Sequence, residues 1–71
     1  MKYVVRVEGM MCHGCENHVN LAVSKLDGVK KVKSNHRKNE TIIVSKNELD
    51  EELIRSTIKE AGFEAKEITR K

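Results

Sequence analysis

The chain has 71 residues, 38% of them hydrophobic and 35% charged, and its 14 Lys and Arg against 11 Asp and Glu give a net charge of +3. This mixture excludes a disordered tail and predicts a single compact domain over residues 1–71. Nucleic-acid binding is disfavoured, because the charge is mixed in sign and only 3% of the residues are aromatic. No apolar run approaches the ~20 residues that span a bilayer, so we expect no membrane insertion.

The first third of the chain predicts a strand, a loop and a helix. The alternation in residues 3–8 predicts a strand, whose inward side chains are Tyr3, Val5 and Val7. Glycines stand at both ends of a loop over residues 9–14. From Cys15 onward, apolar residues recur at helical spacing, and the core-facing stripe is Cys15, Val19, Ala22, Val23 and Leu26. Gly28 is well placed to end this helix.

The middle of the chain predicts two strands joined by a polar turn. Residues 29–36 form the first of them, with Val32, Ser34 and His36 on one face. Residues 37–40 supply the turn, and residues 41–45 form the next strand. Its expected inward side chains are Ile42 and Val44.

The last third predicts a helix followed by a short strand. Asp50 is expected to cap the helix N-terminus, with Leu49 packing back onto the first turns. The apolar stripe of this helix is Leu53, Ile54, Ile58 and Ala61. Gly62 is expected to end the helix. Residues 63–69 then form a strand whose inward candidates are Ala65 and Ile68.

The order of elements is strand, helix, strand, strand, helix, strand. Two such split units in tandem predict an α+β fold, with a four-stranded antiparallel sheet and two helices on one face.

Residues 9–15, with the sequence GMMCHGC, contain the candidate metal-binding or redox-active residues. Two thiols separated by two residues can both reach one ion where the chain turns. Cys15 falls at or inside the start of the helix, where free N–H groups and the helix dipole favour the thiolate, the form that binds metal. The N-terminus lacks the apolar run of a signal peptide, so we expect a cytoplasmic setting. There, a close cysteine pair is more often a metal or redox site than a disulfide.

The identity of the metal follows from which ligands are present. A closed structural zinc site requires four ligands, and the sequence has no second cysteine pair. Cu(I) is soft and can be held by two thiolates, so we expect Cu(I) bound by Cys12 and Cys15. Hg(II) shares this preference and Zn(II) is a further alternative.

An alternative function is a small dithiol oxidoreductase. A thioredoxin-like enzyme places its cysteine pair in a larger α/β fold with a different order of elements. The sequence shows no arrangement of serine, histidine and carboxylate for nucleophilic catalysis, so we expect a binding module and not an enzyme. Haem attachment is excluded because Glu16, not histidine, follows Cys15.

Several other residues near the loop have candidate roles. His13 is favoured as a spacer or hydrogen-bond donor, with a third metal ligand as the alternative. His18 is expected to be a solvated helix residue. Met10 is expected to fill the core and Met11 to be exposed for docking, although thioether ligation suits Cu(I). A basic run forms either plain solvated surface or a docking face, and its members are Lys30, Lys31, Lys33, Arg37 and Lys38.

With these residues in place, the chain resembles the heavy-metal-associated domain family, which includes bacterial copper chaperones and N-terminal domains of copper-exporting P-type ATPases. The loop is similar to that family's Gly-Met-x-Cys-x-x-Cys, and the similarity continues through Val19, residues 26–29 and residues 61–63. The resemblance implies a ferredoxin-like βαββαβ fold, Cys12 and Cys15 as metal ligands, Met10 in the core, and Phe63 packed near the metal loop.

The same resemblance implies a partner and one local anomaly. The partner would be a P-type metal-transporting ATPase or a cognate metallochaperone that receives the ion by ligand exchange. We expect a monomer without metal, with a metal-bridged dimer as the alternative state. Ser34 and His36 stand where the family usually has apolar inward residues, so we expect a looser core near the second strand or a shifted register.

Overall fold

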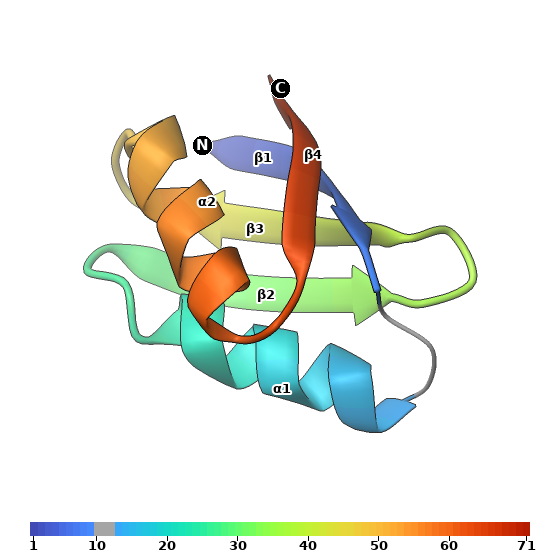
Figure 1. The fold of residues 1–71 in the computed structure, drawn as a ribbon. Coiled ribbons are helices and arrows are strands. Elements are labelled where there is room, and N and C mark those ends of the chain that lie inside the picture. Colours follow the sequence, from blue (N-terminus) through green and yellow to red (C-terminus); the bar gives the residue numbers. More distant parts are fainter. Residues whose placement is uncertain (10–12) are drawn as a thin grey trace.

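The computed structural model describes residues 1–9 and 13–71, with His13 described at its backbone only. The elements are β1 (Lys2–Glu8), α1 (His13–Ser24), β2 (Val29–Asn35), β3 (Glu40–Ser45), α2 (Glu51–Glu60) and β4 (Glu64–Arg70). The strands form one sheet of order β2-β3-β1-β4, antiparallel at every contact. Both helices lie on one face of this sheet (Figure 1). The predicted order of elements and the predicted α+β fold are confirmed.

The core lies between the sheet and the two helices. Its buried hydrophobic side chains are Tyr3, Val5, Val7, Val19, Val23, Ile43, Leu49, Ile54, Ile58 and Ala65. The inward face predicted for the first strand is therefore confirmed, as are the central residues of the first helical stripe. Burying each aliphatic side chain of this kind contributes about 1.5–3 kcal/mol. Cys15, Leu26 and Phe63 are partly buried and pack against this core.

The inward face predicted for β3 is wrong. Ile42 and Val44 are only partly buried, and the buried side chains of the strand are Thr41, Ile43 and Ser45. Two hydroxyls tolerate this burial because both are hydrogen-bonded: Thr41 Oγ1 lies 3.0 Å from Ser34 Oγ, and Ser45 Oγ donates to a backbone carbonyl at 2.6 Å. A paired hydroxyl avoids the cost of a buried group without a partner, so β3 can turn its polar residues inward.

The helix α1 begins and ends earlier than predicted. It starts at His13, inside the segment expected to be a loop, and stops at Ser24, four residues before Gly28. The expectation that Gly28 directly ends the helix is therefore wrong. Gly28 instead adopts a φ of +90° in the turn that leads into β2, and its carbonyl accepts a hydrogen bond from the Lys46 N–H at 2.8 Å.

The helix α2 has the predicted caps but a narrower apolar stripe. Asp50 Oδ1 accepts a hydrogen bond from a backbone N–H two residues on, at 2.9 Å. Gly62 has a φ of +95°, and its N–H and that of the next residue bond to carbonyls of the last turn, which is a Schellman ending. The stripe consists of the fully buried Ile54 and Ile58, whereas Leu53 is 48% exposed, contrary to prediction. No helix in the described ranges is long and apolar enough to cross a membrane.

A bulge in β4 explains how its inward residues can be three apart. Ala65 is buried and Ile68 packs against the core, as predicted. Along β1, Arg6 pairs with Glu67 but the next residue, Val7, pairs with Ala65. The one-residue shift in register resets the alternation of side chains, so both predicted residues face the helices.

Candidate metal site

Cys15 is the predicted ligand that the structure describes. It is the third residue of α1, partly exposed, and it packs against the hydrophobic core. This position in the first turn puts Cys15 at the end of the helix where the free N–H groups and the positive end of the helix dipole lie. The predictions for Cys12, Met10 and Met11, and for the His13 side chain, fall outside the described residues.

Phe63 packs against Gly9 at the end of β1. Gly9 follows β1 and has a φ of +102°, and a Cβ built on it would lie 3.2 Å from the Phe63 ring. The same ring meets His18 edge-on, with centroids 6.1 Å apart and planes at 73°. Phe63 therefore joins the end of β1 to α1 beside the loop. His18 is exposed as expected, but it also has this ring contact.

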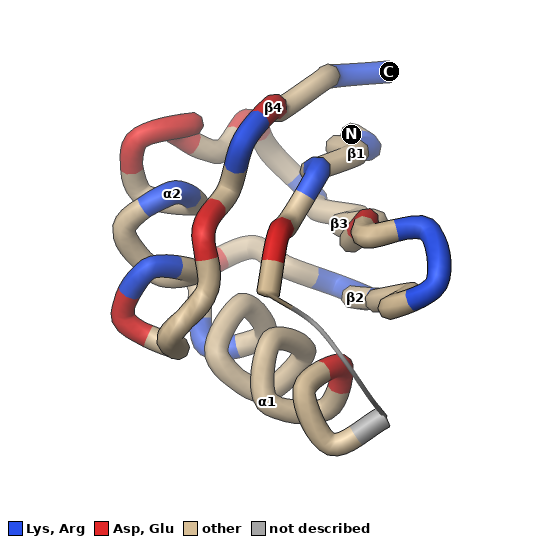
Figure 2. Tube along the Cα trace, turned by 45° about the vertical axis from the view of Figure 1, so that its right-hand side comes forward, with Lys and Arg blue, Asp and Glu red and all other residues tan. Residues whose placement is uncertain are grey.

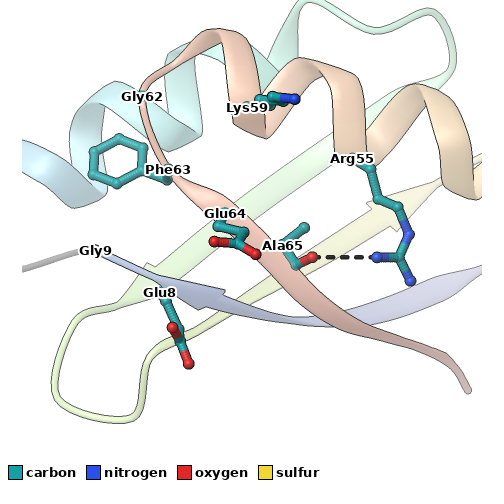
Figure 3. Close-up of a pocket in the computed structure, with 8 residues that line it drawn as sticks. All are labelled: Glu8, Gly9, Arg55, Lys59, Gly62, Phe63, Glu64 and Ala65. Atoms are coloured by element: carbon teal, nitrogen blue, oxygen red, sulfur yellow. Dashed lines mark hydrogen bonds between the residues drawn. The ribbon is translucent and has the colours of Figure 1, made fainter.

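A hollow lined in part by Phe63 lies between the end of β1, the start of β4 and α2 (Figure 3). Its charged lining residues are of both signs: Glu8, Glu64, Arg55 and Lys59. The Arg55 guanidinium is engaged with the Ala65 carbonyl, to which it donates a hydrogen bond at 3.2 Å. Because the charges oppose one another, the hollow does not favour a ligand of either sign, and we assign it no binding role.

Glu16 joins the first turn of α1 to the end of β2. Its Oε2 accepts a hydrogen bond from the backbone N–H of His36 at 2.7 Å and lies 2.6 Å from His36 Nδ1. The two side chains are 15% and 21% exposed, respectively. In the sequence, Glu16 stands out only as the residue that excludes haem attachment, and His36 only as a polar residue at an inward position of the second strand. No sequence pattern places Glu16 opposite His36, because their contact depends on how α1 lies over β2.

A second polar contact joins the same helix to the same strand. Ser34 Oγ donates to Asn20 Oδ1 at 2.7 Å and lies 3.0 Å from Thr41 Oγ1. In the described part of the chain, no buried side-chain nitrogen or oxygen lacks a partner. The expectation of a looser core here stays a prediction, and the alternative expectation, a shifted register, is met elsewhere in β2. Ser34 keeps its register with Thr41, and the irregularity between β2 and β3 lies instead between Val29 and Lys31.

Charge is distributed unevenly over the molecule. Helix α1 has a single formally charged residue, Glu16, in a chain of which 35% is charged (Figure 2). One large apolar side chain of this helix, Leu21, is 66% exposed. The residues of the predicted basic run are exposed along β2 and the turn after it, and its members are Lys30, Lys31, Lys33, Arg37 and Lys38. Helix α1 thus carries one formal charge, whereas the basic run lies on β2 and the turn after it.

The contact between Gly9 and Phe63 gives a first prediction. Gly9→Ala and Gly62→Ala both place a Cβ at a φ near +100°, which costs about 1–2 kcal/mol of unfolding free energy. Only Gly9→Ala also presses on the Phe63 ring, because nothing lies within 4 Å of a Cβ at Gly62. We expect the larger loss of stability from Gly9→Ala in urea denaturation. Equal losses would mean that the ring moves aside without cost.

Comparison with known proteins adds evidence that is independent of this geometry. A model of the heavy-metal-associated domain matches residues 4–64. The copper chaperone CopZ of Staphylococcus haemolyticus is 33% identical over 64 residues, which are 89% of this chain and 94% of the chaperone. A mercuric reductase of Lysinibacillus sphaericus is 36% identical over 67 residues, which are 94% of this chain but only 12% of the reductase.

A solved structure shares the whole architecture. The crystal structure of a copper-binding domain from HMA7, a P-type ATPase, has a TM-score of 0.86 and 38% sequence identity to this chain. The match covers 97% of this chain and 93% of that domain. The chain thus spans nearly all of one chaperone and of one excised ATPase domain, but a small part of the reductase.

Proposed function

Because the chain belongs to the heavy-metal-associated domain family, we propose that it binds one soft metal ion and delivers it to a partner protein. The observation that carries this proposal is the position of Cys15 in the first turn of α1, two residues after His13 and three after Cys12. A Cys-x-x-Cys pair that leads into a helix N-terminus offers two thiolates to a single ion. We take residues 1–71 to act as a single domain in this role.

The ion is Cu(I), held by Cys12 and Cys15. Two thiolates suit a soft monovalent ion, and the copper chaperone and the copper-binding ATPase domain support this choice by their similarity. The similarity to a mercuric reductase favours Hg(II) as the second candidate. Both ions use the same ligands, so the choice between them does not alter the site.

Transfer proceeds by exchange of ligands. Two-coordinate Cu(I) has room for a third thiolate, so a cysteine of the partner forms a Cu–S bond before the bond to Cys12 breaks. The incoming thiol gives its proton to solvent, and the Cys12 thiolate takes one up after it leaves. The oxidation state of copper is unchanged. Cys15 packs against the core, so we expect it to be the last ligand to let go.

The partner presents its own Cys-x-x-Cys loop on a P-type ATPase or on a metallochaperone of the same fold. The weakly charged surface of α1, with Leu21 exposed, can approach such a loop without first removing charges from water. The exposed lysines of β2 would steer an acidic partner toward it, which makes association sensitive to salt. A reducing cytoplasmic setting keeps both thiols available.

Anaerobic titration against a strong Cu(I) chelator tests the proposal. We expect one equivalent of Cu(I) to bind, and parallel titrations with Hg(II) and Zn(II) rank the three ions. The redox alternative is tested by reduction of insulin without metal. Substoichiometric Cu(I) binding together with efficient insulin reduction would replace the proposed function with that of a dithiol oxidoreductase.

A further inference from the structure

The first turn of α1 has little hydrophobic packing of its own. The fully buried residues of the helix, Val19 and Val23, lie one and two turns further along. Within residues 14–16, Gly14 is exposed, and Cys15 and Glu16 are only partly buried. The opening N–H groups of a helix also lack intrahelical partners, so helix ends fray. A side-chain contact to the sheet therefore adds to the packing of Cys15 against the core in fixing this turn.

The Glu16–His36 pair supplies that contact. One carboxylate oxygen receives the His36 backbone N–H at 2.7 Å and the ring nitrogen at 2.6 Å. Both side chains are largely shielded from solvent, and hydrogen bonds to a carboxylate are about twice as strong as neutral ones. His36 directly follows β2, so the pair joins the first turn of α1 to the sheet across 20 residues of sequence.

The Glu16–His36 pair, which acts as a tether between α1 and the sheet, involves the residue next to Cys15. Glu16 follows Cys15 directly, so whatever holds the Glu16 side chain also restrains the backbone that carries the sulfur. Metal sites tolerate about 0.5 Å of displacement before binding weakens, and residues that orient a ligand typically contribute about 10–100-fold in metal affinity.

We propose that Glu16 and His36 are positioning residues that hold the Cys15 thiolate in place and slow the release of bound metal. This inference rests on the proposed function and extends it to two residues that do not themselves ligate the ion. Glu16 contributes more than the His36 ring, because its carboxylate also receives the backbone N–H that any residue at position 36 would present.

The chain contains a matched control. Asn20 lies one turn further along α1 and hydrogen-bonds to Ser34 of the same strand at 2.7 Å. It sits beside the buried Val19, so that turn is already fixed by packing. Removing the Asn20 bond therefore weakens the contact between helix and sheet without releasing Cys15.

The first arm of the test measures the rate at which Cu(I) passes from the loaded protein to excess chelator. Relative to wild type we expect Glu16→Ala to release copper about tenfold faster. His36→Ala should give a smaller increase, because the backbone N–H remains. Asn20→Ala should stay within about twofold of wild type, since the first turn is unaffected. Equal acceleration by Glu16→Ala and Asn20→Ala would overturn the inference in favour of general destabilisation.

The second arm needs no metal and follows alkylation of Cys15 by iodoacetamide in a Cys12→Ser background. Local opening of the first turn exposes the thiol, so we expect Glu16→Ala to react about fivefold faster and Asn20→Ala at the wild-type rate. Glu16→Gln removes the charge but keeps an oxygen acceptor for His36. It should react within about twofold of wild type.

The two arms separate this inference from the proposed function. If Glu16→Gln reacted as fast as Glu16→Ala, the effect would come from the charge of Glu16 and not from its tether, and the positioning role would be refuted. If the wild-type protein failed to bind Cu(I), the proposed function would fall. The alkylation rates would still decide whether Glu16 and His36 hold Cys15.

Discussion

Cys15→Ser is expected to lower the Cu(I) affinity at least about a thousandfold, or about 4 kcal/mol. A hydroxyl is a poor ligand for a soft ion, and a site of two thiolates has no spare soft donor. Cys12→Ser should have an effect of the same size. Competition with a Cu(I) chelator of known affinity under anaerobic conditions measures both.

Variants of the neighbouring residues serve as controls for the cysteine variants. His13→Ala and Met11→Ala keep both thiolates, so we expect each to change the affinity less than about tenfold. If either cysteine variant kept the wild-type affinity, the assignment of Cys12 and Cys15 as ligands would be wrong. A loss from His13→Ala as large as that from Cys15→Ser would instead make His13 a third ligand.

Loading with Cu(I) is expected to raise the melting temperature strongly. Metal that binds only the folded form adds about 4 kcal/mol to the free energy of unfolding when free Cu(I) exceeds Kd a thousandfold. For a domain of this size that corresponds to a Tm higher by roughly 15–30 °C. Thermal denaturation followed by far-UV circular dichroism, with and without one equivalent of Cu(I), measures the shift.

The protein without metal should already be folded. Among the described residues, ten buried hydrophobic residues from the sheet, both helices and the segment before α2 form the core, so we expect folding not to depend on the ion. We expect dispersed backbone amide resonances for the metal-free form. A Cys12→Ser/Cys15→Ser double variant should keep the metal-free Tm in the presence of Cu(I). A shift as large as that of wild type would place the metal elsewhere.

The two helices, apart from the ends of α1, and the order of elements along the chain were predictable because each rests on a strong local signal. The period in residues 15–26 predicts the buried Val19 and Val23, and Asp50 and Gly62 mark the ends of α2. The inward face of β3 was not predictable from the same rule. Residues 42–44 are all apolar, so alternation gives no phase. In the structure Thr41, Ile43 and Ser45 face inward, and the Thr41 hydroxyl lies within hydrogen-bond distance of Ser34 of β2.

The candidate site was predictable only in part. Spacing and residue type single out Cys12 and Cys15, because both proposed ligands lie within one short segment of the sequence. The tether from Glu16 to His36 joins residues 20 apart in sequence, and its existence depends on how α1 lies over β2. Polar residues at inward positions were read as a defect of packing, whereas Ser34 and His36 both have hydrogen-bond partners in α1.

The measurement that tests the central claim most directly is Cu(I) transfer to a second Cys-x-x-Cys domain in the presence of excess chelator. Ligand exchange through a three-coordinate intermediate never frees the ion, so copper should reach the second domain well before it reaches the chelator. Stopped-flow absorbance of the chelator complex, with separation of the two proteins at fixed times, follows both routes. Copper appearing on the chelator as fast as on the second domain would mean that the ion dissociates first, which would contradict delivery by direct handover.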